Sequence, residues 1–367
     1  MKMTSTPAKN AGYLLTLAPQ MLLVLGTYMG HPWLSVAFFF ALLPVARQFI
    51  GNDLSAPNKE PSAALGLYLR SIPRVYVAIW ALVLPWTVWT LATMPMTIAQ
   101  YVGFSLALWI VCSLNTAVAH ELIHSRSRVD RKLGSLMDAS VGYFHFTEEH
   151  LSHHARNGFF HSGDAAAPGT SVYAFAFQRY GRSLLTAWEF EQGRLKRASQ
   201  SWRSNRLLRK SLIPVLIATV FYAFAGPIGL GIYLFQLVGS AFTVQAITYL
   251  QHWGLSEAQT PSLADHGFSW DDGCWMQACV TLNHAYHSQH HLNMARPYYA
   301  QGFVKSGLLL PASYPVMFVV ALVPSIFSSI MKTRLKLWID ANERRDSLEH
   351  DDDCIGASRI AQAMRDC

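Results

Sequence analysis

Three long stretches of the chain, over 10–46, 75–119 and 211–256, contain no Asp, Glu, Lys or Arg at all. A helix that crosses a bilayer needs only about 20 consecutive apolar residues. Each stretch is therefore long enough for a hairpin of two membrane-spanning helices. A large soluble protein would still need a charged face on most of its helices, whereas only 14% of this chain is charged and 51% is apolar. These stretches predict an all-α membrane protein.

Glycine and proline mark the places where the helices of each hairpin reverse direction. They lie in the short segments 30–32, 92–95 and 226–227. The fold is therefore predicted to contain six transmembrane helices, joined in pairs by short turns. The six predicted spans are 12–30, 33–50, 73–94, 97–119, 212–225 and 228–250.

These spans are expected to belong to one membrane domain over 12–335. Residues 120–210 and 251–335 are expected to form a histidine-rich helical cap on the cytoplasmic side, and 336–367 a charged tail. The apolar segment 302–330 is interrupted by prolines, which break helices, so it is expected to lie against the membrane surface as a lid rather than to span the bilayer.

The positions of the basic residues predict the orientation in the membrane. None of the 29 Lys and Arg residues lies in the three hairpin turns. Because basic loops stay in the cytoplasm, we expect both termini and both long connections on the cytoplasmic side of the inner membrane. The net charge of +7 is then explained by basic residues that flank the membrane spans, and no nucleic-acid partner is expected. The first apolar run lacks a convincing cleavage site and is read as an anchor rather than a signal peptide.

The five cysteines form no CxxC pair, and thiols in the reducing cytoplasm seldom form structural disulfides. The sequence also lacks a Gly-rich dinucleotide fingerprint, a Walker loop and a ferredoxin-like cysteine run. Any redox chemistry must therefore draw electrons from another protein. A basic segment that could dock such a partner, or could simply satisfy the positive-inside rule, contains Arg194, Lys196, Arg197, Arg203, Arg206, Arg209 and Lys210.

Most of the 15 histidines fall in three short stretches at the expected cytoplasmic face. His120 and His124 stand four residues apart, so on a helix both imidazoles can reach one metal ion. The HExxH spacing is also the zinc-protease signature. That alternative accounts for only one or two further ligands, whereas seven more candidate histidines remain.

The other candidates follow an HxxHH spacing, which places three imidazoles on one helical face. This spacing occurs twice, and a lone histidine ends the last predicted span. Nine neutral imidazoles with open coordination positions suit a dinuclear iron site better than zinc, which closes at four ligands. His284 is expected to lie next to the metal-binding histidines without binding a metal itself, and the role of His161 is left open. The predicted ligands are His120, His124, His150, His153, His154, His252, His287, His290 and His291.

Metal-bound imidazoles need hydrogen-bond partners for their second nitrogens. Six carboxylates lie near the histidines in the sequence, and a solvated surface role is an equally open alternative for each. They are Glu121, Glu148, Glu149, Asp164, Asp271 and Asp272.

With these motifs the sequence resembles the integral-membrane alkane and xylene hydroxylases, within the wider membrane desaturase and hydroxylase superfamily. The segments 120–124, 248–255 and 287–291 are similar to the family's HE[LM]xH, NYxEHYGL and HSDHH boxes, and 164–173 and 310–318 add to the resemblance. Three departures leave the substrate subgroup open between linear alkanes and methyl-bearing aromatics or terpenes. Thr248 and Gln251 replace the usual Asn and Glu, and two residues separate His150 from His153, where alkane members have three.

The resemblance implies a diiron monooxygenase that uses O2 to convert a terminal or benzylic methyl group to a primary alcohol. It implies no catalytic residue beyond the metal ligands and no organic cofactor. Electrons would come from a rubredoxin or from a ferredoxin-type NADH reductase. A desaturase or fatty-acid decarboxylase at the same type of site is the alternative. An apolar substrate is expected to leave the bilayer between spans rich in Trp80, Trp86, Trp89, Phe104 and Trp109.

Overall fold

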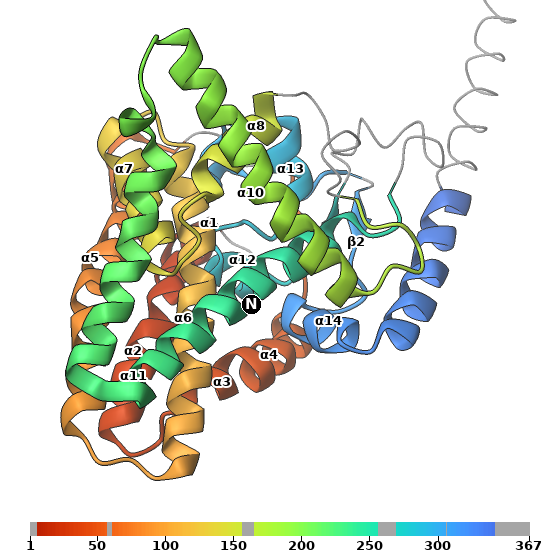
Figure 1. The fold of residues 1–367 in the computed structure, drawn as a ribbon. Helices are drawn as coiled ribbons and strands as arrows, with labels where there is room; N and C mark the ends of the chain where they lie inside the picture. Colours follow the sequence, from red (N-terminus) through yellow and green to blue (C-terminus); the bar gives the residue numbers. More distant parts are fainter. Residues whose placement is uncertain (1–5, 57–60, 156–164, 256–268, 306, 342–367) are drawn as a thin grey trace, which may run out of the picture.

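A computed structural model describes residues 6–56, 61–155, 165–255, 269–305 and 307–341 of the chain, except for the side chains of 153–155. Within these ranges the protein is mostly helical and has almost no strands, which confirms the predicted class (Figure 1). Four helices are long and apolar enough to cross a membrane, and a shorter apolar helix runs over Leu34–Ile50. The four are Pro7–Tyr28, Ala63–Thr93, Ile98–Ile123 and Arg206–His252.

All six predicted spans fall on helical segments. The first two are assembled from shorter pieces that follow one another along the chain, and the second contains a π-helical turn, η2. The next two are the single helices α5 (Ala63–Thr93) and α6 (Ile98–Ile123). The shorter pieces are α1 (Thr6–Gly12), η1 (Tyr13–Leu17), α2 (Ala18–Tyr28), α3 (Leu34–Ala37), η2 (Phe38–Leu42) and α4 (Leu43–Ile50).

The last two spans are the two halves of α11 (Arg206–His252), which diverge from a sharp bend (Figure 1). The bend lies at Gly226, whose backbone angles of φ 64° and ψ −159° are not helical. A residue with a side chain adopts such a conformation only under strain. Pro227 follows directly and cannot donate a backbone hydrogen bond to the preceding turn. The predicted reversal at this position is confirmed.

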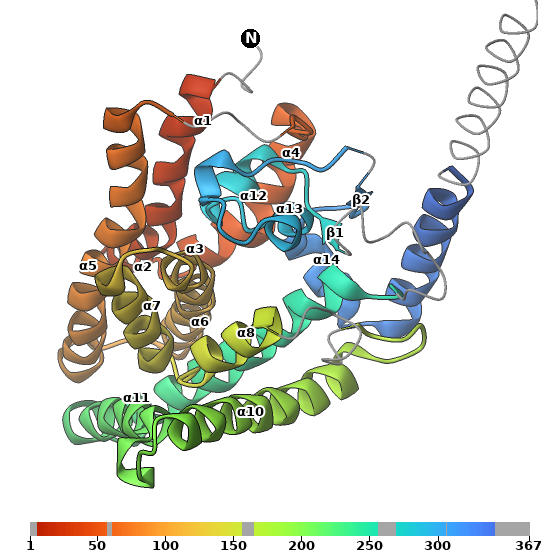
Figure 2. The ribbon, with the colours of Figure 1, turned by 90° about the horizontal axis from the view of Figure 1, so that it is seen from above.

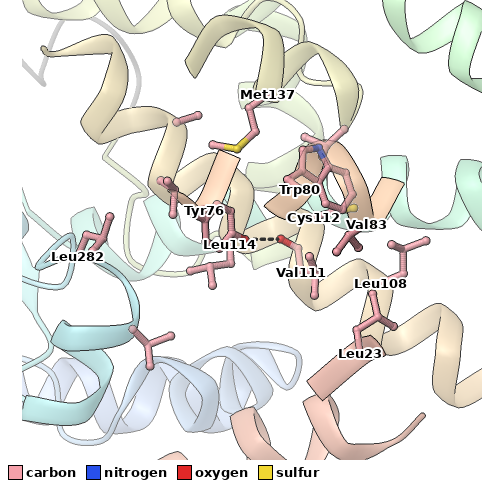
Figure 3. Close-up of a cluster of buried hydrophobic side chains, with 14 of the residues drawn as sticks. Leu23, Tyr76, Trp80, Val83, Leu108, Val111, Cys112, Leu114, Met137 and Leu282 are labelled. Atoms are coloured by element: carbon pink, nitrogen blue, oxygen red, sulfur yellow. Dashed lines mark hydrogen bonds between the residues drawn. The ribbon is translucent and has the colours of Figure 1, made fainter. Parts of the chain in front are cut away.

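Helix α6 lies at the centre of the hydrophobic core and packs against α2, α5, α7 (Arg128–Ser140) and α11. Figure 3 shows side chains of α6 meeting Leu23, Tyr76 and Trp80 from its neighbours. The Tyr76 hydroxyl donates a hydrogen bond to the Asn115 amide oxygen over 2.7 Å. Because α6 ends in the first histidine motif, this packing fixes the position of His120 and His124.

The remaining elements connect or follow these long helices along the chain. Figure 2 shows α8, α12 and α13 between α4 on one side and α10 on the other. The proline-rich segment is interrupted, as predicted: α14 ends at Ala321, and a further helix covers 324–341. These elements are α8 (Phe146–Ala155), α10 (Val172–Arg197), η3 (Trp202–Ser204), α12 (Trp275–Val280), α13 (His287–Leu292), η5 (Tyr298–Ala300), α14 (Tyr314–Ala321) and the parallel strands β1 (Trp270–Asp271) and β2 (Leu308–Leu309).

Candidate metal centre

Four of the predicted ligands converge on one point from three helices. His120 lies at the end of α6, His124 just beyond it, His150 on α8 and His290 on α13. The nitrogens that they offer all lie within 4.8 Å of one another. The Nε2 atoms of His124 and His150 are 2.8 Å apart. We call these four residues the first histidine group.

Three more predicted ligands form a second histidine group, which consists of His252, His287 and His291. His252 ends α11, and the other two lie one turn apart on α13 with their Nε2 atoms separated by 2.8 Å. Helix α13 serves both groups, since the rings of His287 and His290 are 5.7 Å apart. The HxxHH spacing thus places neighbouring imidazoles on one short helix, and two metal ions held there would be close neighbours.

His284 lies between the two groups. Its ring centre is 4.5 Å from that of His120 and 5.1 Å from that of His287. The backbone of His153 and His154 continues α8 beyond His150, but their side chains lie outside the described part of the chain. His161 and Asp164 also lie outside it.

The donor set fits a metal ion. The Nε2 atom of His120 is buried and has no hydrogen-bond partner among the described residues. A buried polar nitrogen without a partner is costly, and here its neighbours are other imidazoles. Imidazole-rich sites suit iron, zinc, copper and nickel rather than magnesium or calcium.

The nearby carboxylates are buried, so the surface role left open for them is wrong for Glu148, Glu149, Asp271 and Asp272. Glu148 pairs with Lys210, and the side chain of Asp271 accepts hydrogen bonds from the backbone and hydroxyl of Ser288 at 2.9 and 3.0 Å. These contacts anchor α8 and α13, which carry the ligands.

Arg179 of α10 links α8 to α11 beside the first histidine group. Its guanidinium donates to Gln245 over 2.7 Å and to Glu149 over 3.2 Å. Gln245 in turn donates to the hydroxyl of Tyr143. The sequence analysis did not identify Arg179. The sequence feature that could have revealed Arg179 is its spacing on α10. Phe175, Arg179 and Ser183 follow one another at intervals of four residues and share one buried face of the helix.

Two buried groups near the histidine groups have shifted pKa values. His145 shares a 3.0 Å hydrogen bond with Ser183; burial, together with the positive charges of Lys210 and Arg179, lowers its pKa to about 3. Burial raises the pKa of Asp271 to about 8, although hydrogen bonds from Ser288 oppose the shift. His145 is therefore neutral at pH 7 and lies in neither histidine group.

The N-terminal segment also supports the centre. Lys9 and Asp53 form a buried ion pair with 2.6 Å between Nζ and Oδ2. The hydroxyl of Tyr286, the residue before α13, donates to the backbone carbonyl of Asp53 over 2.8 Å. Lys9 also lies 5.0 Å from the centre of the Tyr286 ring. This contact holds the start of α13 against two segments that are distant in sequence.

A cavity of about 180 Å³ leads to both histidine groups. Its walls come mainly from α6, the second half of α11, α14 and η2. Thr243, Thr248 and Thr281 line it, but their hydroxyls donate hydrogen bonds to carbonyls of their own helices. The lining therefore presents mostly carbon to a bound molecule.

Of the aromatic residues expected to border the substrate route, Trp109 lines this cavity. Trp80 and Phe104 are buried in the helix core, and Trp86 packs against Tyr28. Trp89 is 51% exposed. Trp109 therefore gives the expected substrate route its support in the structure, and the passage between the spans stays a prediction.

Part of the basic segment is used inside the protein. Arg194 and Arg206 both bind the buried carboxylate of Glu191 at 2.7 Å, and Lys210 pairs with Glu148. The residues of this segment that are exposed are Lys196, Arg197, Arg203 and Arg209.

The fold and the site together define a membrane-type helical protein with two adjacent groups of imidazoles at the inner end of an apolar cavity. Such a protein is a candidate metal-dependent membrane enzyme. Residues 95–320 match the family model of the fatty acid desaturases. The chain belongs to this family.

Individual relatives resemble the chain over most of its length. Alkane 1-monooxygenase 1 of Alcanivorax borkumensis is 28% identical over 83% of this chain and 78% of its own length. An alkane 1-monooxygenase of Pseudomonas putida is 27% identical over 86% of this chain and 81% of its own length. The hydroxylase component of the xylene/toluene monooxygenase of Pseudomonas putida is 26% identical over 65% of this chain and 66% of its own length. The resemblance to alkane and xylene hydroxylases is confirmed.

Proposed function

We propose that this protein is a membrane monooxygenase that hydroxylates a terminal or benzylic methyl group of an apolar hydrocarbon. The observation that carries this proposal is the pair of adjacent, all-histidine groups at the inner end of an apolar cavity. The names of the relatives support the reaction class, since they are monooxygenases of alkanes and of xylene or toluene. The alternative of a desaturase or decarboxylase is not favoured, because the relatives named above are monooxygenases.

Nine histidines would hold two irons in this proposal: the seven of the two groups together with His153 and His154. Bound iron would supply O2 activation with two external electrons, for the overall reaction RH + O2 + 2 e⁻ + 2 H⁺ → ROH + H2O. The chain's own part is to keep the imidazoles converged and to exclude water from the cavity. His120 lines the cavity, so a methyl group at its inner end would lie beside the centre.

The proposal includes six spans in the inner membrane, with the site and both termini on the cytoplasmic side. The distribution of Lys and Arg around the apolar stretches supports this orientation. A rubredoxin or a ferredoxin-type NADH reductase would then approach from the cytoplasm. The exposed residues Lys196, Arg197, Arg203 and Arg209 would favour an acidic carrier, because opposite charges accelerate encounter.

The test uses purified protein in lipid vesicles, supplied with NADH, a reductase and rubredoxin, and fed octane or p-xylene under ¹⁸O2. We expect a primary alcohol that carries the label, and none when the electron carrier is omitted. An alkene, or an alcohol without the label, would contradict the proposed reaction.

Metal content tests the centre separately. We expect close to two irons per chain, and fewer after His290→Ala, because this residue converges with three other imidazoles. His31→Ala is the matched control, since His31 is exposed in a hairpin turn and should leave the iron content unchanged. Stoichiometric zinc with full activity would exclude the diiron assignment.

A further inference from the structure

One side chain of the cavity wall, that of Phe40, is also exposed on the surface of the protein. This side chain lines the cavity and is 36% exposed. Its neighbour Phe39 also lines the cavity. Both belong to η2, a π-helical turn within the apolar helix over Leu34–Ile50. Single π-helical turns are rare and frequently occur at functional sites.

Trp109 of α6 is held in the wall of the same cavity by contacts with α11. Its indole N–H donates to the Thr243 hydroxyl over 2.9 Å. Gly239 permits this position, since a Cβ atom there would lie 2.7 Å from the indole ring. The ring also contacts Phe235 and Phe318, with ring centres 6.3 and 6.0 Å away.

The surface around these residues is apolar. Phe235 and Val238 of α11 are 45% and 66% exposed, and Leu42 of η2 is 50% exposed. These residues belong to the stretches 10–46 and 211–256, which contain no charged residue. An exposed apolar surface of this kind is costly in water and favourable among lipid acyl chains.

We propose that the substrate enters the cavity directly from the bilayer, through an opening beside Phe40 and Trp109 between η2, α6 and α11. This inference rests on the proposed function, because only an apolar substrate concentrates in the bilayer. The route requires no passage through water, and it leads past Trp109 to His120 at the other end of the cavity.

A bulky thiol label tests the opening from outside the cavity. Phe235 contacts Trp109 but does not itself line the cavity, so Phe235→Cys would place a maleimide label in front of the opening. Leu216→Cys is the control, since Leu216 is also exposed, at 65%, on the same helix. Cys354 and Cys367 are replaced by serine, whereas Cys112, Cys274 and Cys279 are buried and can stay.

In vesicles, the label on Phe235→Cys should lower kcat/KM for octane by at least about fivefold and leave kcat nearly unchanged, because it slows access and not the reaction. The label on Leu216→Cys should change neither constant. A nitroxide on Phe235→Cys should be more accessible to O2 than to a water-soluble nickel chelate. The reverse order of accessibility would overturn the proposal, as would equal slowing by both labels.

A second pair of variants needs no label. Gly239→Ala should push the Trp109 ring towards the opening and lower kcat/KM. Gly231→Ala lies on the same helix with no atom within 4 Å of its added methyl group, so it should behave like the parent protein. If the parent protein forms no alcohol, the proposed function fails. If it forms alcohol while neither Gly239→Ala nor the label on Phe235→Cys lowers kcat/KM, only the route fails.

Discussion

Glu191 is a fully buried carboxylate between α10 and the start of α11. Burial by itself raises the pKa of this group, but hydrogen bonds from Arg194 and Arg206 outweigh burial and hold the pKa at about 2, below the ordinary 4.5. The folded protein therefore stabilises the charged carboxylate of Glu191 relative to its protonated form. Its stabilising contribution is complete above pH 4.5 and is lost as the pH falls through about 2.

We predict that Glu191→Gln lowers the free energy of unfolding at pH 7 by about 2 kcal/mol, in the range for hydrogen bonds to charged groups. The melting temperatures of the two proteins in micelles should converge as the pH falls below 4.5. Glu189→Gln, two residues away at an exposed position of the same helix, serves as the control. A gap between parent and Glu191→Gln that stays constant from pH 7 to pH 3 would refute the role of the charge.

The Lys9 and Asp53 pair is another buried charge pair, and it links the N-terminal segment to α13 through Tyr286. We predict that Lys9→Met destabilises the protein by about 3–5 kcal/mol, because it leaves Asp53 buried without its cation. Iron content should fall as well. The double variant Lys9→Met with Asp53→Leu should recover part of the stability.

Chemical unfolding in micelles measures these differences, and iron analysis measures the effect on the centre. Lys196→Met, which removes an exposed lysine, is the control. Equal stability of Lys9→Met and Lys196→Met would mean that the ion pair contributes little.

The predicted ligands could be recognised from the sequence because their spacing is local. His287, His290 and His291 lie on one face of any helix that contains them. Arg179 and Lys9 could not be recognised in this way. Their partners lie 30 and 44 residues away in sequence, and only the folded chain brings them together.

At the scale of helices, α7 crosses α6 very closely at Gly134. A Cβ atom there would lie 2.8 Å from the carbonyl oxygen of Ala119 and 3.0 Å from Leu122 and Ile123. A backbone carbonyl and two branched side chains cannot move aside without a loss of stability. Ala119 and Leu122 lie on either side of His120 in the sequence. The distance between α6 and α7 therefore also affects the position of this predicted metal ligand.

We predict that Gly134→Ala destabilises the protein by about 1–3 kcal/mol through overpacking and lowers its iron content. Gly181→Ala on α10 adds the same methyl group in open space, and should be neutral or stabilise by about 0.4–1 kcal/mol. Melting temperature and iron content in micelles check both variants. Similar behaviour of the two would show that the crossing tolerates extra volume.

The long helices and their turns could be predicted, because uncharged stretches and Gly or Pro punctuation are properties of the local sequence. The π-helical η2 and the short helix α12 could not. No periodicity marks a five-residue π-turn, and α12 is fixed by contacts with α4 and η1. The cavity arises where four elements fail to fill the space between them, which no single segment reveals.

For the molecule as a whole, the proposed orientation places His31 outside and Trp202 in the cytoplasm. Both are exposed. We predict that a membrane-impermeant maleimide labels His31→Cys in spheroplasts, whereas Trp202→Cys reacts only after permeabilisation. The two variants control for each other's expression and accessibility. Labelling of Trp202→Cys in sealed cells would overturn the orientation.

The separation of the histidines along the chain has a consequence for biosynthesis. His120, His124 and His150 leave the ribosome early, yet their group lacks His290 until α13 has been made, and the second group needs the same short helix. Neither metal position is complete on a nascent chain that ends before residue 287. If the two groups hold metal as proposed, insertion of the metal is therefore a late event in biosynthesis, after most of the helices have been made.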